Sequence, residues 1–79
     1  MSDVDDLLAL AIKETENLEG DEVFLVKDLF KGYKWNRIPR NVRLLLGTLF
    51  LHHVNQANIP IRPIEKTSSG QQRYKVEKL

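Results

Sequence analysis

The residues that could catalyse a reaction or hold a metal ion are few in this chain and poorly spaced. There is no cysteine, and the two histidines, His52 and His53, are neighbours. Adjacent helix positions diverge by about 100°, so these two imidazoles cannot chelate one metal ion together. Ser68 and Ser69 have no acid–base partner in sequence, and no glycine-rich phosphate loop is present. We therefore expect a binding protein, with no enzymatic activity, metal, cofactor or small-molecule substrate.

Basic and amide side chains gather instead around the start of the longest helical pattern. In a helix-turn-helix, the first residues of the recognition helix meet the base edges, and Arg and Asn suit guanine and adenine. A solvated, charged helix start would have the same composition. The candidate nucleic-acid contacts here are Lys34, Arg37, Arg40, Asn41 and Arg43.

A second polar group surrounds Gly70 in what we expect to be a hairpin tip. Hydroxyl, amide and basic side chains are the usual contacts to phosphates, and a glycine lets the backbone approach closely. An ordinary polar turn is the alternative. The candidates in this group are Lys66, Ser68, Ser69, Gln71, Arg73 and Lys75.

Charge is unevenly distributed along the chain. Residues 1–22 carry eight acids and one base, whereas residues 23–79 carry eleven bases and three acids, which leaves a net charge of +1. A basic body suits a polyanionic partner. The acidic segment has two alternative roles: it covers the basic surface until a partner displaces it, or it is a core helix with a solvated acidic side.

Apolar spacing predicts the two long helices that position these groups. Residues 1–20 form an acidic amphipathic helix, capped by Ser2 or Asp3 and stopped by Gly20. A longer helix starts at Pro39 and runs to about Gln56. Its inward stripe is Val42, Leu45, Leu46, Leu49 and Phe50. Gly47 costs about 1 kcal/mol relative to alanine there, which indicates a close helix contact.

Short elements fill the rest of the chain. Residues 23–26 read as a strand, residues 27–32 as a short helix ending at Gly32, and residues 33–36 as a turn whose aromatics pack on the core. Pro60 and Pro63 restrict residues 59–64 to an edge strand. Residues 67–70 form a turn, and residues 72–77 return with Tyr74 and Val76 on one face.

This order of elements predicts a single α+β domain over residues 1–79, a winged helix. Residues 1–20 are its N-terminal helix, and residues 21–79 supply a short strand, two helices forming a helix-turn-helix and a C-terminal β-hairpin wing. The long helix also carries Leu44 and Leu51 on its expected outward face. Recognition helices rarely present leucines to a groove of DNA, so this face is either buried by the N-terminal helix or is a protein-binding patch.

From Val23 onward the chain resembles a small family of bacterial and phage-borne proteins, the domain of unknown function number fourteen-thirteen. The likeness rests on residues 26–30 (VKDLF), 32–35 (GYKW), 46–50 (LGTLF) and 66–74 (KTSSGQQRY). The resemblance implies a compact domain from a mobile element and brings no activity or ligand.

We expect a small DNA-binding protein, a transcriptional regulator of bacterial or phage origin. The alternative is a protein-interaction module, a dimeric adaptor or modulator of a host factor, that uses the N-terminal helix and the long helix. No segment has the roughly 20 apolar residues of a membrane span, and no secretory signal is visible, so a cytoplasmic protein is expected.

Overall fold

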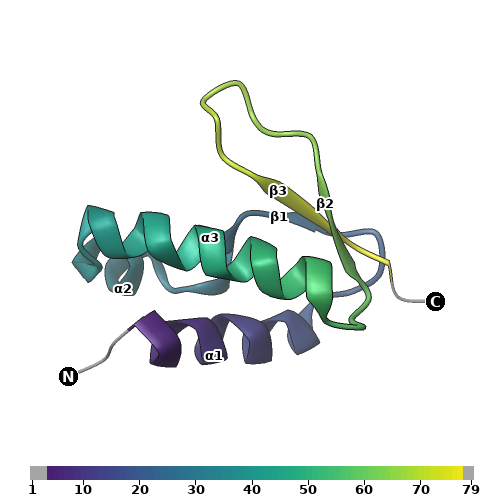
Figure 1. The fold of residues 1–79 in the computed structure, drawn as a ribbon, viewed down its shortest axis with the longest axis horizontal. Coiled ribbons are helices and arrows are strands. Elements are labelled where there is room, and N and C mark those ends of the chain that lie inside the picture. The colour runs from purple at the N-terminus through teal and green to yellow at the C-terminus, as the bar shows by residue number, and fades with distance from the viewer. Residues whose placement is uncertain (1–3, 78–79) are drawn as a thin grey trace.

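The computed structural model describes residues 4–77 and contains three α-helices and three strands among them (Figure 1). In chain order these are α1 (Val4–Glu14), β1 (Val23–Phe24), α2 (Gly32–Arg37), α3 (Arg40–Gln56), β2 (Ile61–Ile64) and β3 (Arg73–Val76). Two 3₁₀ turns, Thr15–Asn17 and Val26–Leu29, lie between them. The predicted capping residues Ser2 and Asp3 lie outside the described residues.

The three strands form one antiparallel sheet in the order β1-β3-β2. Tyr74 of β3 pairs with Phe24 on one side and with Pro63 on the other. Pro63 lies on an edge strand, as predicted, because proline has no N–H to donate to a further neighbour. The short strand pairs with the hairpin, also as predicted.

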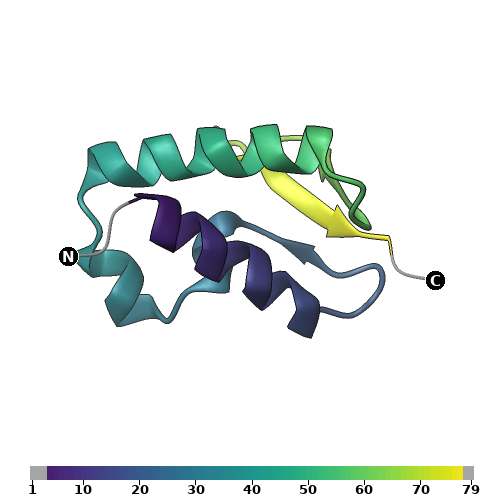
Figure 2. The same cartoon turned by 60° about the horizontal axis from the view of Figure 1, so that its bottom comes forward.

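The core joins this sheet to the two long helices. Three aromatic rings meet at its centre: the centroid of Tyr74 lies 5.6 Å from that of Phe24 and 5.0 Å from that of Phe50. Ala11 of α1 belongs to the same cluster and is fully buried, and Leu46 of α3 is fully buried as well. Figure 2 shows α1 running alongside α3 at an angle, with α2 near the beginning of α1. The acidic helix is therefore part of the core.

The prediction for residues 25–38 was wrong in its details. Leu25 donates its N–H to the carboxylate of Asp28 at 2.9 Å, away from the sheet, so β1 ends at Phe24 and a 3₁₀ turn follows. Gly32 begins α2, where a stop was predicted, and the expected turn at residues 33–36 is helical. Trp35 packs against Phe30, but Tyr33 points outward and is 53% exposed.

The long helices also differ from expectation at single positions. α1 gives way to a 3₁₀ turn that ends at Asn17, three residues before the predicted stop at Gly20. In α3 the inward residues are Leu46, Phe50 and Val54, whereas Leu45 is 47% exposed. The close helix contact expected at Gly47 is absent, because a Cβ built there meets nothing within 4 Å.

The fold class is α+β, and its arrangement is consistent with the predicted winged helix. α2 and α3 follow each other as the helix pair, and the loop between β2 and β3 extends beyond the sheet as a wing (Figure 1). Within residues 4–77 no helix is long and apolar enough to cross a membrane.

Candidate functional site

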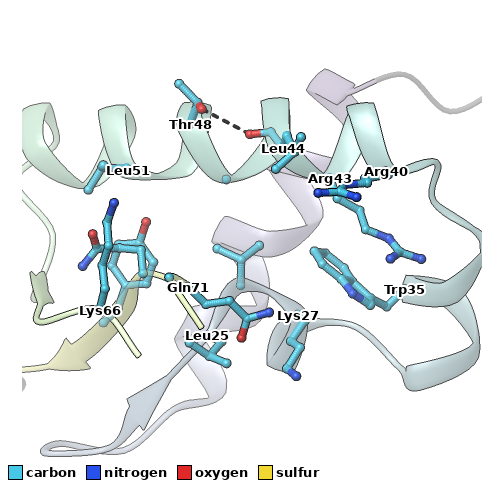
Figure 3. A pocket seen from close by; sticks show the side chains of 15 residues that line it. Leu25, Lys27, Trp35, Arg40, Arg43, Leu44, Thr48, Leu51, Lys66 and Gln71 are labelled. Carbon is cyan, nitrogen blue, oxygen red and sulfur yellow. Dashed lines mark hydrogen bonds between the residues drawn. The ribbon is translucent and has the colours of Figure 1, made fainter. Parts of the chain in front are cut away.

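A groove of about 480 Å³ lies between α3 and the hairpin loop (Figure 3). Its α3 wall consists of Arg40, Arg43, Leu44, Gly47, Thr48 and Leu51. The loop residues Lys66, Gly70, Gln71 and Gln72 and the segment Leu25, Val26 and Lys27 face this wall, with Trp35 and Tyr74 completing the lining. The groove thus joins the two places where the sequence concentrates basic and amide side chains.

The lining of the groove is positively charged. Four bases, Lys27, Arg40, Arg43 and Lys66, contribute to it, and none of the described residues that line it is acidic. α1, which carries three of the eleven acids, supplies no lining residue and packs on the other side of α3 from the hairpin loop (Figure 1). A concave surface with charge of one sign concentrates the field and attracts anions.

Arg43 is held in place by an aromatic ring. Its guanidinium carbon lies 5.3 Å from the centroid of Trp35, a distance typical of a cation–π contact. Its Nε is buried without a hydrogen-bond partner, and within residues 4–77 neither Arg43 nor Arg40 forms an ion pair. A guanidinium with a fixed plane and free N–H groups suits a phosphate or a base edge.

Hydrogen bonds around Thr67 shape the loop wall. The Thr67 N–H donates to the Gln71 carbonyl at 2.8 Å, and the Gly70 N–H donates to the Thr67 carbonyl at 2.9 Å. The Thr67 hydroxyl accepts the Gln71 N–H at 3.1 Å and contacts the Ser69 hydroxyl at 3.0 Å. Gly70 has a φ of 88°, which disfavours residues with a Cβ. This turn therefore fixes where Lys66 and Gln71 enter the groove.

Tyr74 lines the groove from β3 but is fully buried. Its hydroxyl has no hydrogen-bond partner among the described residues, and burial raises the pKa of Tyr74 to about 12. On the α3 wall, the Thr48 hydroxyl is bonded to the Leu44 carbonyl at 3.1 Å (Figure 3). The phenol is thus neutral at ordinary pH and has an unused donor and acceptor.

Four predicted contact residues meet in the groove: Arg40, Arg43, Lys66 and Gln71. The rest lie elsewhere. Asn41, Ser68 and Ser69 are exposed and do not line it. Lys34 and Arg37 belong to α2, where the Arg37 guanidinium lies 5.1 Å from the ring centroid of Tyr33.

Arg73 and Lys75 flank Tyr74 on β3 and, by the alternation of a strand, point to the opposite face of the sheet. Arg73 pairs with Glu65 at 3.3 Å and Lys75 with Asp21 at 3.9 Å. The structure therefore places both bases away from the groove.

The two leucines proposed as a protein interface differ in exposure. Leu44 is 63% exposed, as expected of an outward position. Leu51 is half-buried and packs against the core, so its outward placement was wrong. Both line the groove.

Several groove residues were missed by the sequence analysis, among them Lys27, Trp35, Thr48 and Tyr74. Gly47 was singled out but assigned to a helix contact. A glycine inside an amphipathic helix was a further signal for this surface, beside the basic and amide clusters.

The side chain of His52 is exposed, and that of His53 is half-buried. Among residues 4–77 no group of three His, Cys, Asp or Glu side chains is placed to hold a metal ion.

Two comparisons with known proteins gave matches. The model of a family described as a domain of unknown function, DUF1413, matches residues 9–75. A solved structure with a similar fold is that of LP1413 of SCCmec type IV, described as a nucleic acids binding protein. The two chains share 17% identity, the match covers 96% of this chain and 95% of the other, and the TM-score is 0.73. No curated protein matches the sequence.

Proposed function

The chain belongs to the DUF1413 family, and from the groove between α3 and the hairpin loop we propose that it is a nucleic-acid-binding protein whose ligand is DNA. The observation that carries the proposal is the charge of the groove, to which four bases and, among residues 4–77, no acid contribute. The proposed role is binding without catalysis. The similar fold of LP1413, described as a nucleic acids binding protein, supports the same choice of ligand.

The bases of the groove are proposed to bind phosphates. Lys27 and Lys66 act as point charges, whereas Arg40 and Arg43 each present several N–H donors. Arg43 is positioned by its contact with the Trp35 ring. The exposed hairpin tip, Ser68 and Ser69, extends the surface toward the adjacent backbone. Asn41, which is exposed at the start of α3, is proposed to contact a base edge.

We further propose that the protein regulates transcription in the cytoplasm of a bacterial cell. Its own gene would belong to the bacterium or to a phage. A winged helix that binds DNA through the second helix of its helix-turn-helix, here α3, and through its wing is suited to this role. Footprinting over the promoter of the protein's own operon is the test, and a protected segment that changes transcript levels on binding is the expected result.

The DNA ligand is tested by anisotropy of a labelled random duplex, titrated with the full chain over a series of salt concentrations. A single strand of the same sequence is titrated in parallel. Each phosphate contact releases condensed counterions, so binding weakens steeply with salt. We expect Arg40→Gln to lower the slope of log affinity against log salt by about one unit.

The matched control is Lys13→Gln, which removes one positive charge from an exposed position on α1, outside the groove. It should leave the salt slope unchanged. Equal effects of the two substitutions would show that net charge alone drives binding, and no binding at low salt to either strand form would refute the proposal.

A second candidate function is a protein-interaction module or homodimer, favoured by the exposure of Leu44 and Leu45 next to each other on α3. Sedimentation equilibrium separates it from the first. A dimer that Leu44→Asp dissociates supports the interface, and a monomer at all concentrations argues against the homodimer. Leu51 is unsuitable for this test because it packs against the core.

A further inference from the structure

Two features that lower the stability of the fold meet in the same groove. One is Gly47, in the interior of α3, and the other is the hydroxyl of Tyr74, which is buried without a partner. Both residues line the groove. Departures from local rules of stability concentrate at functional sites, so their coincidence points to a ligand.

The hydroxyl of Tyr74 has no role in the packing of the protein. The ring contacts Phe24 and Phe50, and a phenylalanine would make the same contacts. The side chain is fully buried, and a buried hydroxyl without a partner is unfavourable. A ligand group that donates to or accepts from this oxygen would satisfy it.

Gly47 likewise has no reason within the fold. A Cβ at this position meets nothing within 4 Å, so alanine would fit and would favour the helix. Since Gly47 lines the groove, the missing side chain leaves room there beside Leu44 and Leu51. The space is bounded by helix backbone and apolar side chains, which suit a flat apolar face.

We propose that this part of the groove, between Gly47 of α3 and Tyr74 of β3, is a subsite for one unstacked nucleobase, whose polar edge bonds the Tyr74 hydroxyl. The inference rests on the proposed function and deepens it. A nucleobase combines flat apolar faces with polar edges, and Arg40, Arg43 and Lys66 border the same groove to bind its phosphates. The groove volume of about 480 Å³ lies in the range of small-ligand sites.

A stacked base pair cannot reach this subsite, because the base must leave the helix to present its edge inside the groove. The subsite therefore predicts a contribution to affinity that depends on the presence of an unpaired base. The phosphate contacts contribute to affinity whether bases are present or not.

The test compares two labelled strands by anisotropy, an oligothymidylate and an abasic strand of the same length. The wild-type chain should bind the base-bearing strand roughly tenfold more tightly, the order expected for one stacked base. Tyr74→Phe should lower this ratio by roughly fivefold, as expected for the loss of one hydrogen bond. Gly47→Leu, which fills the space, should reduce the ratio to about one while the abasic strand still binds.

The matched control is Tyr33→Phe, which removes an exposed hydroxyl outside the groove and should leave the ratio unchanged. Circular dichroism checks that each variant is folded. Equal binding of the two strands by the wild type overturns the subsite and leaves the proposed function intact. An unchanged ratio in both Tyr74→Phe and Gly47→Leu also overturns it. Failure to bind either strand overturns the subsite, and the proposed function is refuted with it only where the random duplex is not bound either.

Discussion

Tyr74 makes the stability of the protein depend on pH in the alkaline range. Burial raises the pKa of its phenol from 10.0 to about 12, because the charged phenolate is poorly solvated inside the fold. Below pH 10 the phenol is protonated in both the folded and the unfolded chain. Between pH 10 and about 12 the unfolded chain loses this proton while the folded chain keeps it, so stability decreases as pH rises.

We therefore expect a pH-dependent difference between the wild type and Tyr74→Phe in chemical denaturation. At pH 7 the variant should be more stable by about 1 kcal/mol, because no hydroxyl is left unpaired. Above pH 10 its advantage should grow by up to about 1.4 kcal/mol per pH unit. An advantage that stays constant to pH 11 would show that the phenol ionises equally in both states.

At the scale of single residues, the sequence predicted which charged side chains line the groove better than it predicted the surroundings of each side chain. Arg40, Arg43 and Lys66 were found because basic residues at a helix start and beside a turn are visible in the sequence. The bases of β3 were misplaced, since a strand sends Arg73 and Lys75 to the face opposite Tyr74. Whether the Tyr74 hydroxyl has a hydrogen-bond partner depends on the groups that surround it in the fold. The spacing of residues along the sequence does not indicate those groups.

At the scale of elements, α3 and the hairpin were predictable because each contains a regular pattern. Apolar residues recur along α3 at helical spacing, and Tyr74 and Val76 alternate along β3. The segment from Leu25 to Ile38 contains no such pattern. Its path depends on one bond from Leu25 to Asp28 and on the packing of Trp35 against Phe30, which arise only in the folded chain.

The hairpin loop offers a test of whether its shape matters for binding. Thr67→Val removes the hydroxyl that bonds the Gln71 N–H and contacts Ser69. These bonds are exposed, so the free energy of unfolding should change by less than about 1 kcal/mol. DNA affinity should nevertheless fall severalfold, because Lys66 and Gln71 lose their fixed positions in the groove.

Amide hydrogen exchange at Gln71 reports the loosening of the loop directly, and faster exchange is expected in Thr67→Val. Thr67→Ser, which keeps the hydroxyl that bonds the Gln71 N–H, is the control and should alter neither the exchange nor the affinity. A loop that exchanges faster but binds equally well would mean that the groove does not need a preformed wall.

At the scale of the whole molecule, α1 belongs to the core and does not cover the groove. Ala11 is fully buried, and Leu8, Ile12 and Leu18 pack against the core cluster. A chain of 79 residues buries only about 60–65% of its unfolded surface, so its stability margin is small. A fully buried large apolar side chain contributes about 1.5–3 kcal/mol, and the half-buried Leu8, Ile12 and Leu18 each contribute less than that.

Deletion of residues 1–18 should therefore unfold the domain, seen as loss of the cooperative thermal transition in circular dichroism. The double substitution Asp5→Asn and Glu14→Gln, at exposed positions of α1, is the control and should keep the transition. A deleted chain that stays folded and binds DNA more tightly would favour the displaceable acidic cover that the structure does not show.

The placement of α1 on the far side of α3 from the groove gives the molecule a dipole moment. With a net charge of only +1, the protein as a whole is weakly attracted to a polyanion at long range. At closer range the field exerts a torque that turns the groove toward the polyanion and α1 away from it. Charges that are farther apart than about 8 Å are largely screened at physiological salt, so this alignment begins only in the last stage of approach. Added salt should thus slow productive encounters by randomising orientation as well as by reducing attraction.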